Sequence, residues 1–236
     1  MLDHFLGEFF GTMLLVIFGC GVVANVLLYQ SKGQHSGWIV ITFGWAMGVF
    51  VGVNTAVHLG GSGHLNPAIT LALALFKDLE QSLVLPYILA QMTGAIVGSG
   101  LVWLMYKQHF DITTDQDLVR AVFCNTPAIR NTTHNLITEI IATFVLMFGA
   151  LAFSPSTDAL GTLNALPAAL LVLGIGLSLG GPTGYAINPA RDLGPRISHY
   201  LLPIKTKGHS DWSYSWIPVI GPIVGASIAV IVYNLL

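Results

Sequence analysis

The chain has 236 residues, of which 54% are hydrophobic and only 8% are charged. Soluble globular domains carry roughly a quarter charged residues, so this composition excludes an ordinary soluble protein and indicates helices solvated by lipid or by one another. The net charge of -2 and the scattered lysines and arginines also exclude nucleic acid as a partner, because no basic run follows a phosphate backbone.

Six apolar segments near the roughly 20 residues that a spanning helix needs follow one another along the chain. They lie around residues 5–28, 37–58, 83–106, 135–154, 164–181 and 214–235. Two further apolar segments, 66–76 and 188–201, are too short to cross a bilayer and are predicted to be half-helices. The sequence therefore predicts a multi-pass membrane protein with two interrupted elements.

The polar stretch 107–134 separates two halves that resemble each other. The first helix carries Glu8 and Thr12, and the fourth carries Glu139 and Thr143 at the same spacing. Internal similarity between halves of three spans each predicts inverted repeats, which place a site at the bilayer midplane. We expect a first repeat, a connecting loop and a second repeat over residues 1–107, 108–134 and 135–236.

Glycines recur at every fourth residue in three of the predicted spans. Such spacing lets helix backbones approach closely and indicates packing rather than function. The pairs are Gly7 and Gly11, Gly94 and Gly98, and Gly221 and Gly225.

Each predicted half-helix begins with the tripeptide Asn-Pro-Ala. Asn is favoured as a helix cap and Pro as the first helical residue, because Pro has no amide hydrogen to leave unpaired. Non-helical backbone at bilayer depth is tolerated only where protein buries it or where it lines a wet cavity. The two breaks therefore predict a pore centre formed by Asn66, Pro67, Ala68, Asn188, Pro189 and Ala190.

The sequence contains no motif for catalysis, for a cofactor or for a metal ion. It lacks a Walker loop and a G-x-S-x-G elbow. Cys20 lies in an apolar segment and Cys124 in a polar one, which argues against a disulfide frame or a metal site. We expect neither an enzyme nor a bound cofactor.

The segments SGHLNPAITLAL at 62–73 and GPTGYAINPARDLGPR at 181–196 resemble the aquaporin, or major intrinsic protein, family, and the likeness covers essentially the whole chain. The resemblance implies an all-α membrane protein with six transmembrane helices and two re-entrant half-helices in an inverted repeat. It also implies a homotetramer in the plasma membrane with both chain termini inside. The distribution of lysine and arginine disagrees with that orientation.

In this family the half-helices meet at their N-termini, where the positive ends of the helix dipoles oppose cations. Asn66 and Asn188 would cap backbone with their oxygens and offer amide hydrogens to a passing molecule. The extended segments before the boxes would present carbonyl oxygens along the pore, from Ser62, Gly63, His64, Leu65, Thr183, Gly184, Tyr185 and Ala186. Donors at the centre and acceptors beside them suit hydroxylated solutes.

Arg191 follows the second box in a chain that is nearly free of intramembrane charge. We expect its guanidinium to line the constriction, donate to hydroxyls and repel cations, and the alternative is a neutralising pair with a nearby carboxylate. Asp192 resembles the residue found in the glycerol-conducting branch. It is expected to pair with Arg196 or with a neighbouring amide.

Three more filter positions are carried over from the family. Tyr185 matches the aromatic of the glycerol-conducting branch, and Gly176 matches its small residue on the fifth span. Phe43 matches the remaining aromatic by pattern, whereas a strict count back from Asn66 selects Ala46. An aromatic wall opposite one charged donor suits a molecule with carbon on one side and hydroxyls on the other.

Glu8 and Glu139 are carboxylates inside predicted spans, where an ionisable residue calls for a functional explanation. The resemblance implies that they accept hydrogen bonds from the half-helix loops, including His64, and a proton relay is the alternative. The sequence thus predicts a passive channel for glycerol and related small neutral solutes with some water. A water-selective aquaporin and a coupled transporter that uses Glu8 or Glu139 remain the alternatives.

Overall fold

A computed structural model describes residues 1–76, 79–153 and 161–236, and this part of the chain is helical without strands. Two 3₁₀ turns, Gln81–Leu83 and Gly161–Leu163, precede longer helices. The α-helices are α1 (Leu2–Leu27), α2 (Trp38–His58), α3 (Pro67–Phe76), α4 (Val84–Met105), α5 (Lys107–Ile112), α6 (Gln116–Ala121), α7 (Thr132–Ala152), α8 (Leu166–Leu179), α9 (Pro189–Leu201) and α10 (Ile217–Asn234).

Five of the six expected spans are helices long and apolar enough to cross a membrane, namely α1, α2, α4, α7 and α10. The sixth, expected over 164–181, is α8, which is apolar but has only 14 residues. Residue 154, at the end of the fourth expected span, lies outside the described residues. The half-helices are α3, with 10 residues, and α9, with 13 residues.

The polar stretch between the halves contains two short helices, where the sequence suggested only a loop. Helix α6 begins after Asp115, whose carboxylate accepts hydrogen bonds from the backbone N–H groups of Asp117 and Leu118. Asn131 caps α7 in the same way by accepting from His134 N–H at 3.0 Å. Capping side chains thus supply partners for backbone groups that would otherwise be unpaired at these helix starts.

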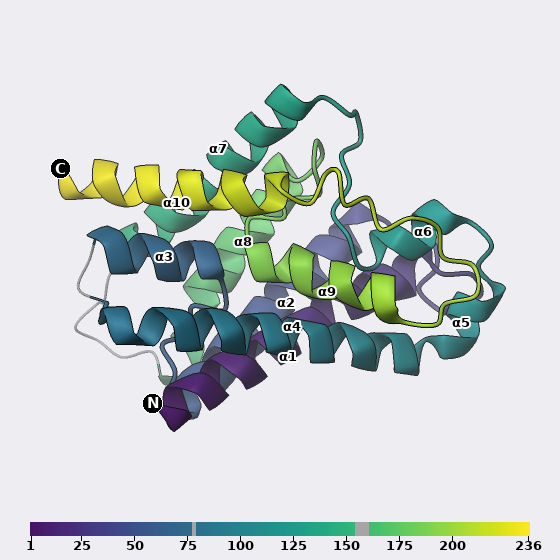
Figure 1. The fold of residues 1–236 in the computed structure, drawn as a ribbon, viewed down its shortest axis with the longest axis horizontal. Coiled ribbons are helices and arrows are strands. Elements are labelled where there is room, and N and C mark those ends of the chain that lie inside the picture. The colour runs from purple at the N-terminus through teal and green to yellow at the C-terminus, as the bar shows by residue number, and fades with distance from the viewer. Residues whose placement is uncertain (77–78, 154–160) are drawn as a thin grey trace.

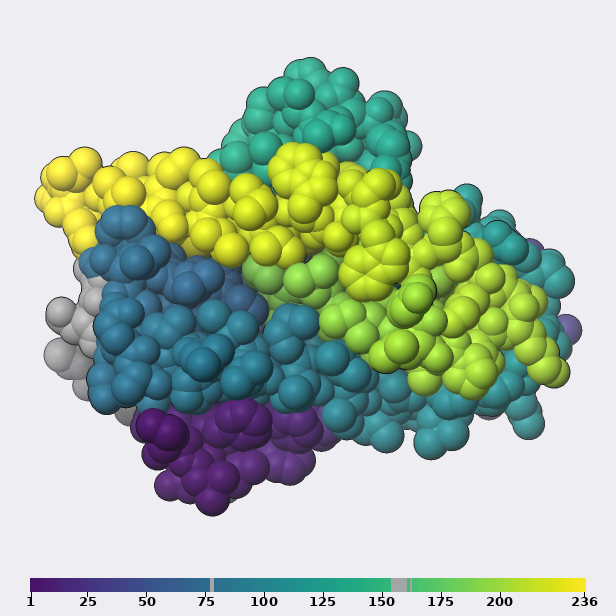
Figure 2. Space-filling model, in the orientation of Figure 1, coloured from purple at the N-terminus to yellow at the C-terminus, as the bar shows by residue number. Residues whose placement is uncertain are grey.

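Each half-helix packs against the last helix of the other half. Helix α3 lies along α10, and α9 lies along α4, so the two short helices run end to end between longer ones (Figure 1). Two other sets of contacts recur in both halves: α1 packs on α2 and α4, and α7 packs on α8 and α10. Figure 2 shows the result on one face, where blue α3 and α4 lie beside yellow α10 and yellow-green α9.

The glycine pairs lie where these helices approach most closely. A Cβ on Gly94 would lie 2.3 Å from the Phe9 carbonyl oxygen, and one on Gly98 would lie 2.5 Å from that of Met13. In the second half, a Cβ on Gly225 would lie 2.2 Å from the carbonyl oxygen of its neighbour on α7. No side chain fits at such distances, so small residues are what allow α4 to pack on α1 and α10 to pack on α7.

Candidate functional site

The two asparagines of the Asn-Pro-Ala boxes meet at the centre of the fold and bond each other's loops. Asn66 Nδ2 donates to the Ile187 carbonyl at 2.8 Å, and Asn188 Nδ2 donates to the Leu65 carbonyl at 2.7 Å. Their Oδ1 atoms cap their own helices by accepting from backbone N–H groups, including that of Ala190. Each amide therefore keeps one hydrogen that is not used in these bonds.

The prolines and alanines of the boxes are buried in the first turns of α3 and α9. Pro67 and Pro189 are each the first residue of their helix, where the missing amide hydrogen leaves nothing unpaired. Ala68 and Ala190 are fully buried. These four residues therefore shape the helix starts, and the asparagines are the members of the boxes that border a cavity.

The backbone before each asparagine is held by a buried glutamate. Glu8 accepts from the N–H groups of His64 and Leu65 at 2.9 and 2.7 Å. Glu139 accepts from Ala186 and Ile187 at 3.0 and 2.9 Å. Leu65 and Ile187 have φ values of 51° and 46°, a left-handed conformation that a branched side chain adopts only when its surroundings enforce it.

Two cavities adjoin at a set of three shared residues. An inner cavity of about 210 Å³ is bordered by Gly63, His64, Leu65, Asn66, Tyr185, Ala186, Ile187, Asn188 and Arg191, together with aliphatic side chains of α1, α2, α3, α7 and α8. An outer cavity of about 280 Å³ is bordered by residues that include Trp38, Asn125, Gly184, Tyr185 and Arg191. Among the residues that the structure describes, only Trp45, Tyr185 and Arg191 border both cavities.

Arg191 lies over the ring of Trp45, with its guanidinium carbon 4.1 Å from the ring centroid. Among the described residues no carboxylate pairs with it, because Asp192 forms its ion pair with Arg196 instead. The Arg196 Nε donates to Asp192 at 2.8 Å, and both side chains are fully buried. Arg191 therefore has a stacked position and keeps its N–H donors free for the cavities.

The expectation for Phe43 is wrong, because the structure places Trp45 beside Arg191. Phe43 is 49% exposed on the outer surface of α2, and it borders neither cavity. Ala46, the other candidate, is buried, and it also borders neither cavity. Trp45, Val49 and Val53 recur at helical spacing along the face that borders the inner cavity.

Gly176 contacts the Tyr185 ring and borders neither cavity. A Cβ at this position would lie 3.0 Å from Tyr185 Cζ, so the glycine makes room for the ring. Trp38 completes the packing: its Nε1 donates to the Gly176 carbonyl at 2.9 Å, and its ring lies edge-on to Tyr185 at 5.8 Å. The Tyr185 ring is thus fixed by α2 and α8, and Trp38 was not anticipated from the sequence.

Two of the eight expected pore carbonyls lie elsewhere. Ser62 borders neither cavity, and its hydroxyl bonds Tyr87 at 2.8 Å. Thr183 also borders neither cavity; its carbonyl accepts from Asn125, and its hydroxyl donates to Glu139 at 2.6 Å. Gly184 borders the outer cavity, although its carbonyl also accepts from Asn125.

The loop before Asn66 is supported by a further buried residue that no motif indicated. Gln91, on α4, donates from Nε2 to Glu8 at 2.9 Å and to the hydroxyl of Thr70 at 3.0 Å. His64 borders the inner cavity, and its ring bonds Thr70 and packs edge-on to Tyr87.

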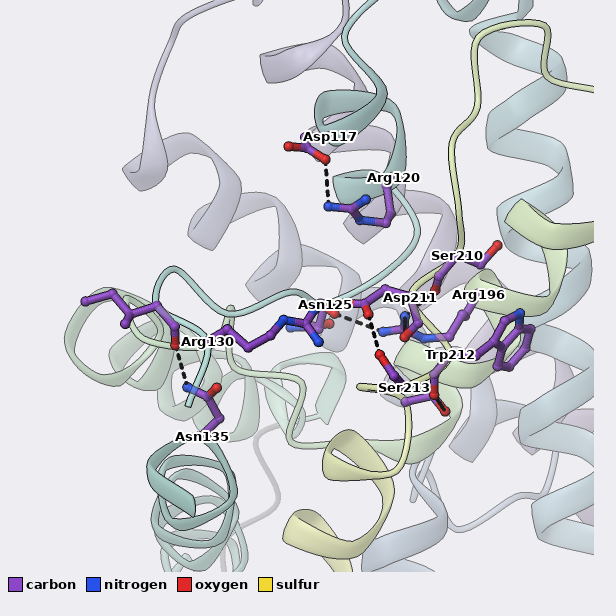
Figure 3. Close-up of polar contacts among 12 residues, drawn as sticks. Asp117, Arg120, Asn125, Arg130, Asn135, Arg196, Ser210, Asp211, Trp212 and Ser213 are labelled. Carbon is purple, nitrogen blue, oxygen red and sulfur yellow. Dashed lines mark hydrogen bonds and ion pairs between the residues drawn. The ribbon is translucent and has the colours of Figure 1, made fainter. Parts of the chain in front are cut away.

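Loops from distant parts of the chain meet at the outer end of α9 (Figure 3). Arg196 donates to the backbone carbonyls of Asn125 and Asp211, and Arg130 forms an ion pair with the Asp211 carboxylate. Burial opposes ionisation of Asp211, but hydrogen bonds from Arg130 and Ser213 and the charge of Arg130 outweigh it and hold its pKa below the ordinary value. The two arginines therefore join α9, the connecting segment and the loop around Asp211 through hydrogen bonds and an ion pair.

Comparisons with known proteins agree with this arrangement. The family model described as "Major intrinsic protein" matches residues 1–233. The chain is 53% identical to a "Probable glycerol uptake facilitator protein" of Thermotoga maritima, covering 98% of this chain and 97% of that one. It is 49% identical to a "Glycerol uptake facilitator protein" of Streptococcus pneumoniae over the full length of both.

One relative is named for a different solute, and one solved structure has a similar fold. A "D/L-lactic acid transporter" of Lactiplantibacillus plantarum is 42% identical, covering 97% of this chain and 95% of that one. The aquaglyceroporin structure from Plasmodium falciparum superposes with a TM-score of 0.87 at 28% identity, covering 99% of this chain and 95% of that one. This protein is an integral, multi-pass membrane protein with the aquaporin fold, and it belongs to the major intrinsic protein family.

Proposed function

We propose that this protein is a passive channel that lets glycerol and related small neutral solutes, with some water, diffuse across the membrane while excluding protons and ions. The observation that carries the proposal is the ring of Trp45, Tyr185 and Arg191 between the two cavities. A solute crossing here passes two aromatic faces and one guanidinium. Full-length relatives named glycerol uptake facilitators support the same solute class.

The lining of the inner cavity is mostly apolar and includes Leu15, Val49, Leu146 and Val172. The half-helix loops and the two asparagines also border it, and we propose that their carbonyls and amides supply its polar groups. A polyol has carbon along one edge and hydroxyls along the other, so it can contact both kinds of group at once. Several weak contacts of this kind permit entry without trapping the solute.

Ion exclusion follows from the positive ends that converge at the pore centre. Helices α3 and α9 both begin there, and Arg191 follows Asn188 by three residues, about one helical turn. Proton relay is opposed because a water that accepts from both asparagine amides cannot also keep a donating orientation toward each side. The role of these groups is part of the proposal.

Stopped-flow light scattering on proteoliposomes tests the function directly. In a gradient of impermeant sucrose, vesicles with the purified protein should shrink fast because water leaves. In a separate glycerol gradient, they should reswell much faster than protein-free vesicles because glycerol enters. Fast shrinkage without faster reswelling would support the water-selective alternative. Saturable uptake driven by a pH gradient and lost in Glu8→Gln or Glu139→Gln would support a coupled transporter.

The proposal includes the assembly and the repeat boundaries. We place the first repeat at 1–107, the connecting segment at 108–134 and the second repeat at 135–236, with one pore per protomer of a homotetramer. The matching bonds of Glu8 and Glu139 and the exchanged packing of α3 and α9 support the repeats. Light scattering of the detergent-solubilised protein would give the mass of the assembly, and a monomeric mass would contradict the tetramer.

A further inference from the structure

The Tyr185 side chain projects from strained backbone. Tyr185 has a φ of 39°, and Gly184 before it has a φ of 78°. A left-handed conformation is ordinary for glycine, but for a bulky residue it costs free energy and persists only when neighbouring groups enforce it. Something in the structure must therefore hold this segment in place.

The corresponding position in the first half needs no such support. Gly63 lies three residues before Asn66, as Tyr185 lies three residues before Asn188, and Gly63 also has a left-handed φ, of 70°. Because glycine lacks a Cβ, the first half adopts a left-handed conformation at this position without strain. The second half has a large aromatic there, so at this position only the loop before Asn188 carries the cost.

Asn125 supplies hydrogen bonds at this point. Its Nδ2 donates to the Gly184 carbonyl at 2.6 Å and to the Thr183 carbonyl at 3.1 Å. Since both neighbours are acceptors, the amide nitrogen must face them, which fixes the orientation of the side chain. The two residues it binds are those immediately before Tyr185.

Asn125 is itself anchored by the charged pair on α9. Its backbone N–H donates to Asp192 Oδ1 at 2.7 Å, and its carbonyl accepts from Arg196 Nη2 at 2.9 Å. The Asp192 and Arg196 side chains are fully buried and bonded to each other, so Asn125 is joined to a buried ion pair. A residue of the connecting segment is thus joined both to the half-helix and to the loop that carries the filter aromatic.

We propose that Asn125 is a positioning residue that sets the width of the constriction by holding the backbone of Tyr185 in its left-handed conformation. Packing against Gly176 and Trp38 fixes the ring, and Asn125 fixes the backbone from which the ring projects. The inference rests on the proposed function, because it assigns solute discrimination to that same constriction. It extends the selectivity determinants to the segment between the two repeats.

The test compares permeabilities to glycerol and to the longer polyol erythritol in proteoliposomes. Asn125→Ala removes the amide, and Asn125→Asp keeps the size of the side chain but removes the donors. Each should raise the ratio of erythritol to glycerol permeability by about fivefold, the effect expected from the loss of a net hydrogen bond. Thr126→Ala, at a neighbour that borders the same outer cavity, should leave the ratio unchanged.

A second background separates positioning from general structural damage. Tyr185→Gly removes the strain, so adding Asn125→Ala to it should change the ratio less than twofold, about the limit of additivity for independent sites. An equally large effect in both backgrounds would overturn the proposal. An Asn125→Asp variant with wild-type discrimination would overturn it too, because the donors would then be irrelevant.

Further outcomes distinguish a folding defect from failure of the proposed function and from failure of the role of Asn125. Asn125→Thr keeps one donor and should give an intermediate ratio, which preserves the test if the Ala and Asp variants cannot be purified; a wild-type ratio in it would count against the proposal. A wild-type protein that passes no glycerol would overturn the proposed function. A glycerol-conducting wild type with unchanged ratios in folded Asn125 variants would overturn only the role of Asn125.

Discussion

Gly176→Ala should narrow the constriction through the Tyr185 ring. The added Cβ would lie 2.8 Å from Thr42 Cγ2, 3.0 Å from Tyr185 Cζ and 3.1 Å from the Tyr185 hydroxyl oxygen. Carbon atoms rest about 3.5–4.0 Å apart, so roughly half an ångström to one ångström of movement is needed. Thr42 is fully buried within α2, whereas Tyr185 also borders two cavities, so the added Cβ should displace the otherwise fixed ring toward the cavities.

Overpacking of this kind costs about 1–3 kcal/mol. A passing glycerol has to push the ring back against the added Cβ, so this cost adds to the free-energy barrier for permeation. About 1.4 kcal/mol added to a barrier lowers a rate tenfold. We therefore expect glycerol permeability to fall about tenfold in Gly176→Ala, while water permeability, which needs a narrower opening, falls less. Stopped-flow light scattering on the same vesicle preparation gives both values.

Gly174→Ala, on the same helix, is the matched control, because apart from its own helix backbone no described atom lies within 4 Å of a Cβ at that position. It should conduct as the wild type does. If folded Gly176→Ala passes glycerol at the wild-type rate, Tyr185 does not border the limiting constriction, and the placement of the filter has to be abandoned.

Three further variants test the charged groups. Arg191→Ala should admit small cations, because it removes the guanidinium from the constriction; conductance across a planar bilayer measures this, and an unchanged conductance would contradict the ion barrier. In Glu139→Gln the side chain cannot accept from both loop N–H groups, so the protein should lose about 1–3 kcal/mol of stability in melting curves. Flux assays should show that glycerol flux stays independent of a pH gradient. An unchanged stability would refute the supporting role of Glu139. Asp211→Asn should lower the melting temperature at neutral pH, because the folded pKa of Asp211 is depressed and its ion pair adds stability above the ordinary value of 3.8. That difference should close as the pH falls through the lowered pKa, and a difference that persists there would refute the electrostatic explanation.

The sequence was sufficient to predict local structure where a residue type has a single structural role at its position. A Pro that follows Asn inside an apolar segment predicts a capped half-helix, and both α3 and α9 begin at that Pro. Asp192 was expected to pair with Arg196 or with a neighbouring amide, and the structure contains both the ion pair and a hydrogen bond from the Asn125 N–H group. These inferences depend on local geometry that the order of residues dictates.

The filter aromatic on α2 could not be identified from the count of residues. Phe43 and Trp45 are two positions apart, and on a helix such residues point in different directions, so an error in register moves the side chain from pore to lipid. The pattern of Trp45, Val49 and Val53 would have favoured Trp45, since these residues repeat at helical spacing on one face. Asn125 lay beyond prediction, because its importance depends on contacts with residues more than 50 positions away.

The exchange of half-helices between the two halves of the fold has a consequence for biosynthesis. While only residues up to the middle of the chain have been made, α3 lacks α10, the helix along which it lies in the finished protein. The interlocked amides of Asn66 and Asn188 cannot form either, because one partner has not yet been synthesised. The conduit is therefore completed only when the C-terminal helix is in place, and a ribosome-bound fragment cannot make the cell envelope leak through a finished passage.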